Sequence, residues 1–123
     1  MRLTIEQIAE AFSRHEFSRT YPYLLDTIQW NLVGNDSIVG KERVIEACEQ
    51  SATYLKTVDV TFRKFFVVPS DNCVVIDSIA AYVDVNQHVT QVASCDLYLF
   101  ADGKMTGITS YTIELNNQDQ SED

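Results

Sequence analysis

Two aspartates inside apolar, strand-like segments are the residues best suited to acid–base chemistry. Asp96 lies in the run Ala93–Phe100, and Asp77 lies in the run Val74–Ile79. A carboxyl group in such surroundings is either desolvated, which raises its pKa, or paired with a cation. Two carboxyl groups in one cavity can divide acid and base roles between them. Strand register decides whether these two share a face. The sequence leaves that register open and favours a solvent-facing or subunit-facing Asp77.

Several polar side chains could complete a ligand pocket around Asp96, although Asp96 could instead make a structural contact with Arg63 or Lys64. Trp30 and Asn31 are neighbours in a strand-like segment, so their side chains point to opposite faces. The Trp30 indole is expected to belong to the core. The Asn31 amide can bind a ligand carbonyl or a neighbouring backbone group.

Six tyrosines provide further polar groups, and some of them are expected to border a pocket or an interface. Tyr21 and Tyr98 are the two candidates for ligand binding. Tyr21 lies beside Pro22, between two predicted helices, and Tyr98 follows Asp96 by two residues on the same predicted strand face.

The sequence predicts no metal centre and no cofactor. His15 lies near the end of the first predicted helix, where a cation interacts favourably with the helix dipole, and His88 lies in a predicted turn. Neither histidine has a second histidine or a carboxylate at metal-ligand spacing. No Gly-rich phosphate loop or nucleophile elbow occurs.

Charge and cysteine content limit the partners and the compartment. The net charge is −9 and the nine basic residues are scattered, so nucleic acid is not an expected partner. No apolar run approaches the ~20 residues of a membrane span, and the N-terminus lacks a signal-peptide core. The three cysteines form no Cys-x-x-Cys pair, which indicates buried thiols in a reducing cytoplasm.

Hydrophobic periodicity predicts helices first and long strands afterwards. Thr4 and Gln7 match a capping box at the start of a helix, Pro22 fits the first turn of a second helix, and Gly40 precedes a third. The first two predicted helices cover residues 4–16 and 22–26. From Val58 the apolar period changes to two. The predicted strands are 27–32, 58–69, 73–85, 89–100 and 105–115.

These elements predict one α+β domain over residues 1–116, followed by a disordered acidic tail over residues 117–123. Strands of ten or more residues twist and curl, and the helices are the elements that can cover the concave face. We therefore expect a cone-shaped α+β barrel, with three N-terminal helices packed in a curved, mainly antiparallel sheet. Apolar side chains left on the convex face predict a homodimer that buries it.

The chain resembles the nuclear transport factor two-like superfamily, especially its SnoaL-like and ketosteroid-isomerase-like branches. The resemblance covers Leu3–Glu114 and rests on the element order, on Trp30, on the Gly40-Lys41-Glu42 helix start and on the terminal hairpin Asp96–Lys104. It implies a cystatin-like cone, commonly dimeric, with a pocket between helices and sheet. Members of the superfamily include isomerases, cyclases, dehydratases, hydrolases and proteins without chemistry, so the fold does not fix the function.

The resemblance carries over only one part of the isomerase machinery. In the isomerases that the chain resembles, a carboxylate at the end of the first strand is the general base, and the matching position in this sequence is Asn31. The amide of Asn31 cannot take a proton near neutral pH, so this role is lost. The resemblance also implies a tyrosine that binds the oxyanion, but the matching positions, Ile8 and Ala9, are apolar. The third implied group, an acidic hydrogen-bond donor, matches Asp96 and is present.

Two functions remain open. The first is a module that binds a small, mostly apolar molecule or dimerises, with no assignable reaction. The second is a general acid–base isomerase, cyclase or lyase that acts on a small apolar carbonyl compound. The position of Asp96 separates them, because the enzyme hypothesis requires Asp96 in a cavity with a second polar group within reach.

Overall fold

The computed structural model of the protein describes residues 2–115. The N-terminal half holds three helical segments and two strands, and the C-terminal half holds four long strands joined in sequence. The elements are α1 (Ile5–Ser13), the 3-10 helix η1 (Phe17–Tyr23), β1 (Leu24–Leu32), β2 (Ile38–Val39), α2 (Lys41–Leu55), β3 (Asp59–Pro69), β4 (Cys73–Val83), β5 (Val89–Ala101) and β6 (Lys104–Leu115). The predicted tail, 117–123, lies outside the described residues.

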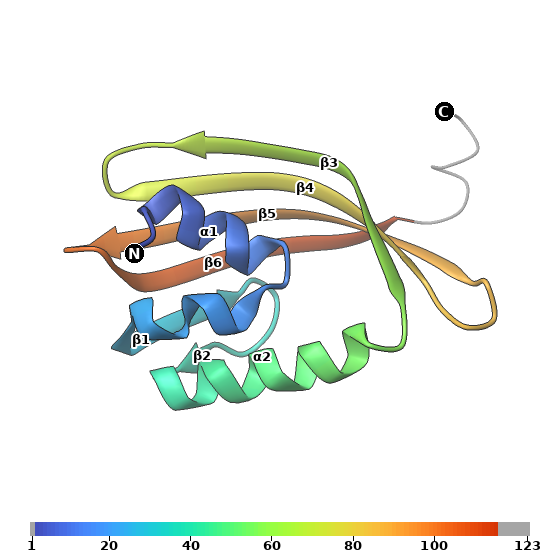
Figure 1. Ribbon diagram of the computed structural model, residues 1–123, viewed down its shortest axis with the longest axis horizontal. Helices are drawn as coiled ribbons and strands as arrows, with labels where there is room; N and C mark the ends of the chain where they lie inside the picture. The colour runs from blue at the N-terminus through green and yellow to red at the C-terminus, as the bar shows by residue number, and fades with distance from the viewer. Residues whose placement is uncertain (1, 116–123) are drawn as a thin grey trace.

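The strands form one open sheet in the order β2-β1-β6-β5-β4-β3. Only β1 and β6 pair in parallel, and the other neighbours are antiparallel, which confirms the predicted mainly antiparallel sheet. Figure 1 shows α1 crossing one face of the sheet and α2 lying beside β1 and β2. The result is a cone-like α+β fold with helices on the inner face of the sheet. No helix of the described chain is long and apolar enough to cross a membrane.

Helix α1 begins with the predicted capping box. The Gln7 backbone N–H donates to Thr4 Oγ1 at 3.1 Å, and the Thr4 backbone N–H donates to Gln7 Oε1 at 2.9 Å. Two of the free amides at the helix start are satisfied in this way. The apolar face of the helix, including Ile8 and Phe12, is fully packed into the core.

We expect the Thr4→Ala variant to unfold with a free energy about 1 kcal/mol lower than that of the wild type, because it loses the side-chain cap. Urea denaturation followed by circular dichroism measures the difference. Thr4→Ser is the matched control, since the serine hydroxyl can still accept from Gln7. Equal losses in both variants would show that the cap does not stabilise the helix.

The end of α1 places His15 in an unusual backbone conformation. The His15 N–H donates to the Phe12 carbonyl at 3.0 Å and the Glu16 N–H to the Ala11 carbonyl at 2.8 Å, which together form a Schellman motif. His15 has φ 69°, in the left-handed region that usually selects glycine at this position. The helix therefore ends at Ser13, earlier than the predicted end at residue 16.

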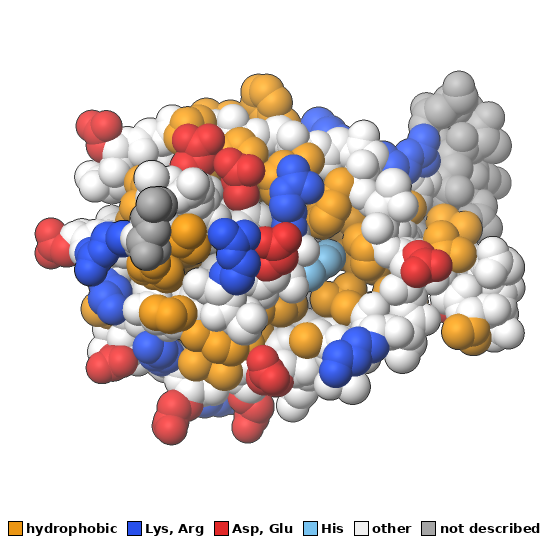
Figure 2. All heavy atoms as spheres, in the orientation of Figure 1, with side chains coloured by type: hydrophobic (Ala, Val, Ile, Leu, Met, Phe, Trp, Pro, Cys, Tyr) orange, Lys and Arg blue, Asp and Glu red, His pale blue; other side chains and the backbone are white. Residues whose placement is uncertain are grey.

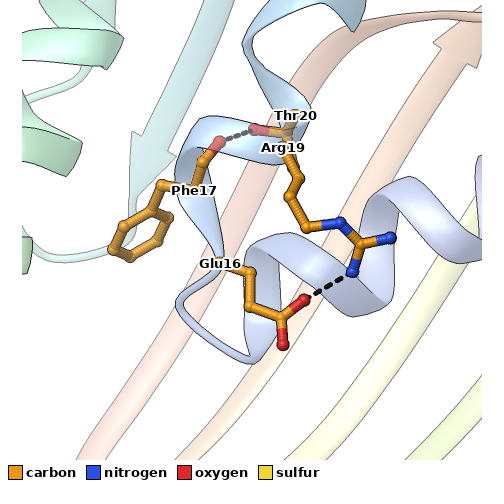
Figure 3. A network of polar contacts seen from close by, with 4 residues as sticks. All are labelled: Glu16, Phe17, Arg19 and Thr20. Atoms are coloured by element: carbon orange, nitrogen blue, oxygen red, sulfur yellow. Dashed lines mark hydrogen bonds and ion pairs between the residues drawn. The ribbon is translucent and has the colours of Figure 1, made fainter.

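The predicted short helix at 22–26 is wrong, because a 3-10 helix occupies Phe17–Tyr23 and β1 already begins at Leu24. Figure 3 shows the contacts that fix this turn. Thr20 Oγ1 donates to the Phe17 carbonyl at 2.6 Å, and Arg19 pairs with Glu16 at 2.6 Å. The Phe17 ring points away from the ion pair. The two-residue strand β2 was not predicted from the sequence, because two residues are too few to show an alternation of polar and apolar side chains.

Alternation along β4 separates the two faces of the sheet. Its buried positions face the helices and its partly exposed positions face outward. The inner side chains of β4 join those of α1, β1, β5 and β6 in one core. The largest fully buried members of this core are Tyr98, Ile8, Leu24, Ile28, Ile76, Met105 and Ile108.

Candidate functional site

A cavity of about 450 Å³ lies between the helices and the inner face of the sheet. This volume is within the range of small-molecule sites, and most of its wall is apolar or aromatic. Its aromatic lining residues are Phe12, Phe17, Trp30, Tyr54, Phe62, Tyr82 and Tyr98, and its hydroxyl groups include those of Ser13, Ser51, Ser78, Ser94 and Ser110.

Asp96 lies in the wall of this cavity. Residue 96 is paired with Ile76 across β4 and β5, so its side chain shares the inner, helix-covered face of the sheet. Ser94 Oγ donates to Asp96 Oδ2 at 3.0 Å. Burial raises the pKa of the Asp96 carboxyl group, while hydrogen bonds from the Ser110 and Ser94 hydroxyls act in the opposite direction. Burial is the larger influence, so the carboxyl group can exchange a proton above the usual aspartate range.

Trp30 connects the first strand to this carboxyl group. Its Nε1 donates to Ser110 Oγ at 2.9 Å, and Trp30 and Ser110 come from the adjacent parallel strands β1 and β6. The indole ring packs edge-on against Phe12 with a centroid distance of 5.2 Å. Trp30 therefore lies in the cavity wall with its polar end directed at the hydroxyl group next to Asp96.

Tyr98 lies on the same face of β5 as Asp96 and is fully buried. Its hydroxyl is 2.6 Å from Ser13 Oγ at the end of α1. Burial and the nearby Asp96 charge raise the pKa of Tyr98 well above its ordinary value. The phenol is therefore a neutral hydrogen-bonding group at the floor of the cavity.

His15 also lines the cavity, because its left-handed backbone directs the imidazole between aromatic rings. The ring centroids of Phe17 and Phe62 lie 5.8 and 5.7 Å from that of His15. Its Nε2 is 3.5 Å from the Tyr82 hydroxyl, and burial lowers the pKa of the imidazole. His15 is therefore neutral at pH 7 and does not act as the helix-end cation that the sequence suggested.

Asp77 lies on the opposite face of the sheet from Asp96. Strand pairing puts Asp77 beside Cys95, one position out of phase with Asp96. Its Oδ2 is 2.7 Å from Lys64 Nζ, and both side chains are about half exposed. The two carboxyl groups therefore cannot share one cavity.

Two other predicted ligand-binding residues lie outside the cavity. Asn31 points to the face opposite Trp30, where its Oδ1 accepts from Gln29 Nε2 at 2.9 Å and from Ser37 Oγ at 2.8 Å. The Tyr21 hydroxyl donates to Glu49 Oε2 at 2.6 Å. The cavity thus contains Trp30, Asp96 and Tyr98 from the predicted set, without Asn31 and Tyr21.

Sequence reasoning missed Ser94 and Ser110, which are hydrogen-bonded to Asp96, and His15, which lies elsewhere in the cavity wall. Ser94 could have been found from the sequence, because residues two apart on a strand share a face. Ser110 could not, since its approach to Asp96 depends on how β5 and β6 pair. His15 could not, because a helix pattern does not show which side chain its end directs inward.

Two further features limit the chemistry of the site. Within residues 2–115 no group of three or more His, Cys, Asp or Glu side chains could hold a metal ion. A smaller recess of about 330 Å³ adjoins the cavity at His15, Leu55 and Phe62 and includes Arg14 and Lys56. The Arg14 guanidinium lies 3.8 Å from the centre of the Phe65 ring, a cation–π contact that orders it outside the main cavity.

We expect the Asp96→Asn variant to be about 1 kcal/mol more stable than the wild type at neutral pH, the order of one desolvated polar group. Since the pKa of Asp96 is raised on folding, the folded state holds the proton more tightly than the unfolded state. The free energy of unfolding of the wild type must then fall as pH rises from the unfolded pKa of about 4 through the folded pKa. Asparagine removes this loss, which urea unfolding over a pH series measures.

Asp77→Asn is the matched control for this pH series, because it removes a carboxylate from the solvent-facing side of the sheet. Loss of its exposed ion pair is expected to change the stability by less than about 1 kcal/mol. A neutral-pH stability of Asp96→Asn below that of Asp77→Asn would show instead that ionised Asp96 stabilises the fold.

Comparison with known proteins finds relatives among solved structures. No protein-family model matches the sequence, and no curated protein matches it. An NTF2-like protein of unknown function from Cytophaga hutchinsonii is 33% identical with a TM-score of 0.76, and the match covers 86% of this chain and 93% of that chain.

Two more distant structures share the fold. A putative polyketide cyclase from Xanthomonas campestris is 17% identical with a TM-score of 0.67, covering 92% of this chain and 87% of that chain. An LEH-like epoxide hydrolase from M. tuberculosis is 18% identical with a TM-score of 0.68, covering 88% and 81%. At these identities the likeness concerns the fold alone.

Proposed function

The chain belongs to the nuclear transport factor two-like (NTF2-like) superfamily, and we propose that it is a dimeric module whose cavity binds a small, mostly apolar molecule. One observation carries the proposal: an aromatic cavity of about 450 Å³ has a hydrogen-bonded carboxyl group, that of Asp96, in its wall. Apolar walls with a few directed polar groups are the usual composition of small-molecule sites. Asp96 with Ser94 and Ser110 would orient the ligand, and the aromatic rings would bury its body.

Trp30 makes ligand binding measurable, because it is the sole tryptophan of the chain and it lines the cavity. We expect adamantanone or adamantanol, which are rigid and apolar, to change the Trp30 fluorescence in a saturable manner. The Val92→Phe variant places a larger side chain in the cavity wall. It is expected to weaken binding by at least about tenfold, since the added ring competes with the ligand for the same volume.

Val89→Phe is the matched control for Val92→Phe, because it makes the same substitution on the same strand at an exposed position. Its affinity for the probes should equal that of the wild type. Equal affinities of all three proteins would show that the probes bind elsewhere, and the cavity would then not be the ligand site.

The dimer proposal rests on the outer face of the sheet. Five large apolar side chains are exposed on this face, at positions that alternate with inward-facing residues. They are Phe66, Val68, Leu99, Tyr111 and Ile113. The Lys64–Asp77 pair lies on the same face, so a second copy that covers it would bury two charges that compensate each other.

A second candidate function is general acid–base catalysis on a small apolar carbonyl compound, as an isomerase, cyclase or lyase. Asp96 and His15 line the same cavity, and each has a pKa shifted by burial, in opposite directions. Such a pair can supply both an acid and a base. Turnover of a carbonyl substrate that is lost in Asp96→Asn and kept in Asp77→Asn would favour this candidate over binding alone.

The cytoplasm is the compartment that this proposal assigns to the protein. Cys48, Cys73 and Cys95 are free thiols, as expected in a reducing environment. Burial raises the pKa of the Cys48 thiol to about 12, so this cysteine acts as a core side chain.

A further inference from the structure

Among the described residues, the main cavity is lined by carboxylate side chains and by no lysine or arginine. The carboxylates are those of Asp96 and Glu114. The two ion pairs among the described residues, Glu16–Arg19 and Lys64–Asp77, involve none of the cavity's residues. Asp96 is therefore a largely buried carboxyl group whose partners on the described chain are hydroxyl groups.

These hydroxyl groups are arranged to donate to Asp96. An indole N–H can only donate, so the bond from Trp30 Nε1 makes Ser110 Oγ an acceptor. The Ser110 proton is then free to bond the carboxyl group of Asp96, and Ser94 Oγ also donates to it at 3.0 Å. These two hydrogen bonds favour the ionised carboxylate, while burial, the larger influence, disfavours it. A positive partner would offset this cost of burial through a charge-assisted hydrogen bond.

The rest of the cavity wall also suits a cation. Aromatic faces attract a positive charge through the ring quadrupole, and tryptophan and tyrosine do so most strongly. Trp30, Tyr54 and Tyr82 line the cavity, and the imidazole of His15 is held neutral by burial. The net charge of −9 adds a long-range attraction for cations. Figure 2 shows acidic and basic side chains interspersed on one face of the molecule. Arg14 and Lys56 line the smaller recess that adjoins the cavity at His15, whereas the described lining of the cavity itself includes no lysine or arginine.

We propose that the ligand of this cavity is a protonated apolar amine, whose ammonium group pairs with Asp96 and whose hydrocarbon body lies against the aromatic wall. This inference rests on the proposed binding function and adds the chemical class of the ligand. A carbonyl ligand would require Asp96 to be protonated in order to donate a hydrogen bond. An ammonium group uses the carboxylate in the state for which the surrounding donors are arranged.

Three probes with one apolar body test the inference: adamantylamine, adamantanol and adamantanecarboxylate, which are cationic, neutral and anionic at pH 7. Each is titrated into the full chain by isothermal calorimetry, with Trp30 fluorescence as a second readout. We expect the amine to bind at least about tenfold more tightly than the alcohol, since a charge-assisted hydrogen bond is about twice as strong as a neutral one. The carboxylate should bind most weakly.

Two carboxylate variants locate the source of the preference. The preference is the ratio of the affinities for the amine and the alcohol measured on one protein, and Asp96→Asn should reduce this ratio to less than about twofold. Asp77→Asn removes the same charge from the other face of the sheet and should keep the full preference. A preference that persists in Asp96→Asn would overturn the inference.

The outcomes also separate the inference from the proposed function. If the alcohol binds as tightly as the amine, or the carboxylate binds most tightly, the amine inference is wrong and binding in the cavity stands. If none of the three probes binds at millimolar concentration, the inference fails together with the support for a ligand-binding cavity.

Discussion

The Phe12→Ala variant is expected to lose about 3–5 kcal/mol of unfolding free energy, because it removes a ring from the centre of the aromatic core. Phe12 is 3% exposed. Its ring makes edge-on contacts with Phe17, Trp30 and Tyr98 at centroid distances of 5.1, 5.2 and 5.8 Å. A domain of this size has a total stability of about 5–15 kcal/mol, so the loss is a large fraction of it. Urea denaturation measures the effect.

Val85→Ala is the control for Phe12→Ala, because Val85 is 83% exposed in the turn between β4 and β5. This variant should unfold within about 0.5 kcal/mol of the wild type. A Phe12→Ala protein as stable as Val85→Ala would mean that α1 can shift to fill the space left by the missing ring. The ring would then not be required to hold α1 on the sheet.

The large effect expected at Phe12 also concerns the site, because the same ring packs the core and lines the cavity. Removing it enlarges the cavity and frees Trp30, whose position determines the hydrogen bond to Ser110. A destabilised but folded Phe12→Ala should therefore bind the neutral adamantyl probes more weakly than the wild type. The aromatic core and the proposed binding site are one structure.

Local patterns were sufficient to predict most of the fold. The period-two segments from residue 58 onward correspond to β3–β6, and the capping box at Thr4 is present at the start of α1. These features depend on residues that are close in the sequence. The parallel pairing of β1 with β6 joins segments about eighty residues apart, and the pattern of neither strand specifies its partner.

The candidate site was less predictable, because the face of the sheet on which a side chain lies depends on how the strands pair. Asp77 and Asp96 occur in similar apolar segments, and the expectation of a solvent-facing or subunit-facing Asp77 rests on the rarity of unpaired buried carboxylates and not on strand register. The pairing of β4 with β5 sets Asp96 opposite Ile76 and Asp77 opposite Cys95, which places the carboxyl groups on different faces. A one-residue shift would exchange the two faces of β5.

The position of His15 depends on backbone geometry that residue type does not show. The end of a helix is most often closed by glycine in the left-handed region, and a histidine there costs conformational energy. The cost is offset by contacts of the imidazole with Phe17, Phe62 and Tyr82 in the cavity wall. An otherwise unfavourable residue at a helix end is thus a sign of a side chain that contributes to a site.

Replacing Ile113 by glutamate is expected to convert the proposed dimer into a monomer. Ile113 is 66% exposed on the outer face of β6, two residues after Tyr111, and strand pairing aligns Tyr111 with Phe66 across the sheet. A carboxylate buried there on association would lose its hydration, which costs about 3–5 kcal/mol where no cation compensates it. Each dimer contains the substitution twice, so the dissociation constant should rise by more than about 100-fold. Light scattering and sedimentation at micromolar concentration measure the change.

Val85→Glu is the matched control for Ile113→Glu, because it adds the same charge at an exposed apolar residue outside the strands. Its association should equal that of the wild type, which rules out an effect of net charge on a protein that already carries −9. Unchanged circular dichroism of both variants would show that the fold is intact. A wild-type monomer, or an Ile113→Glu protein that still dimerises, would mean that the apolar outer face of the sheet is not the interface. The exposed Phe66, Val68 and Leu99 would then need another partner to bury them.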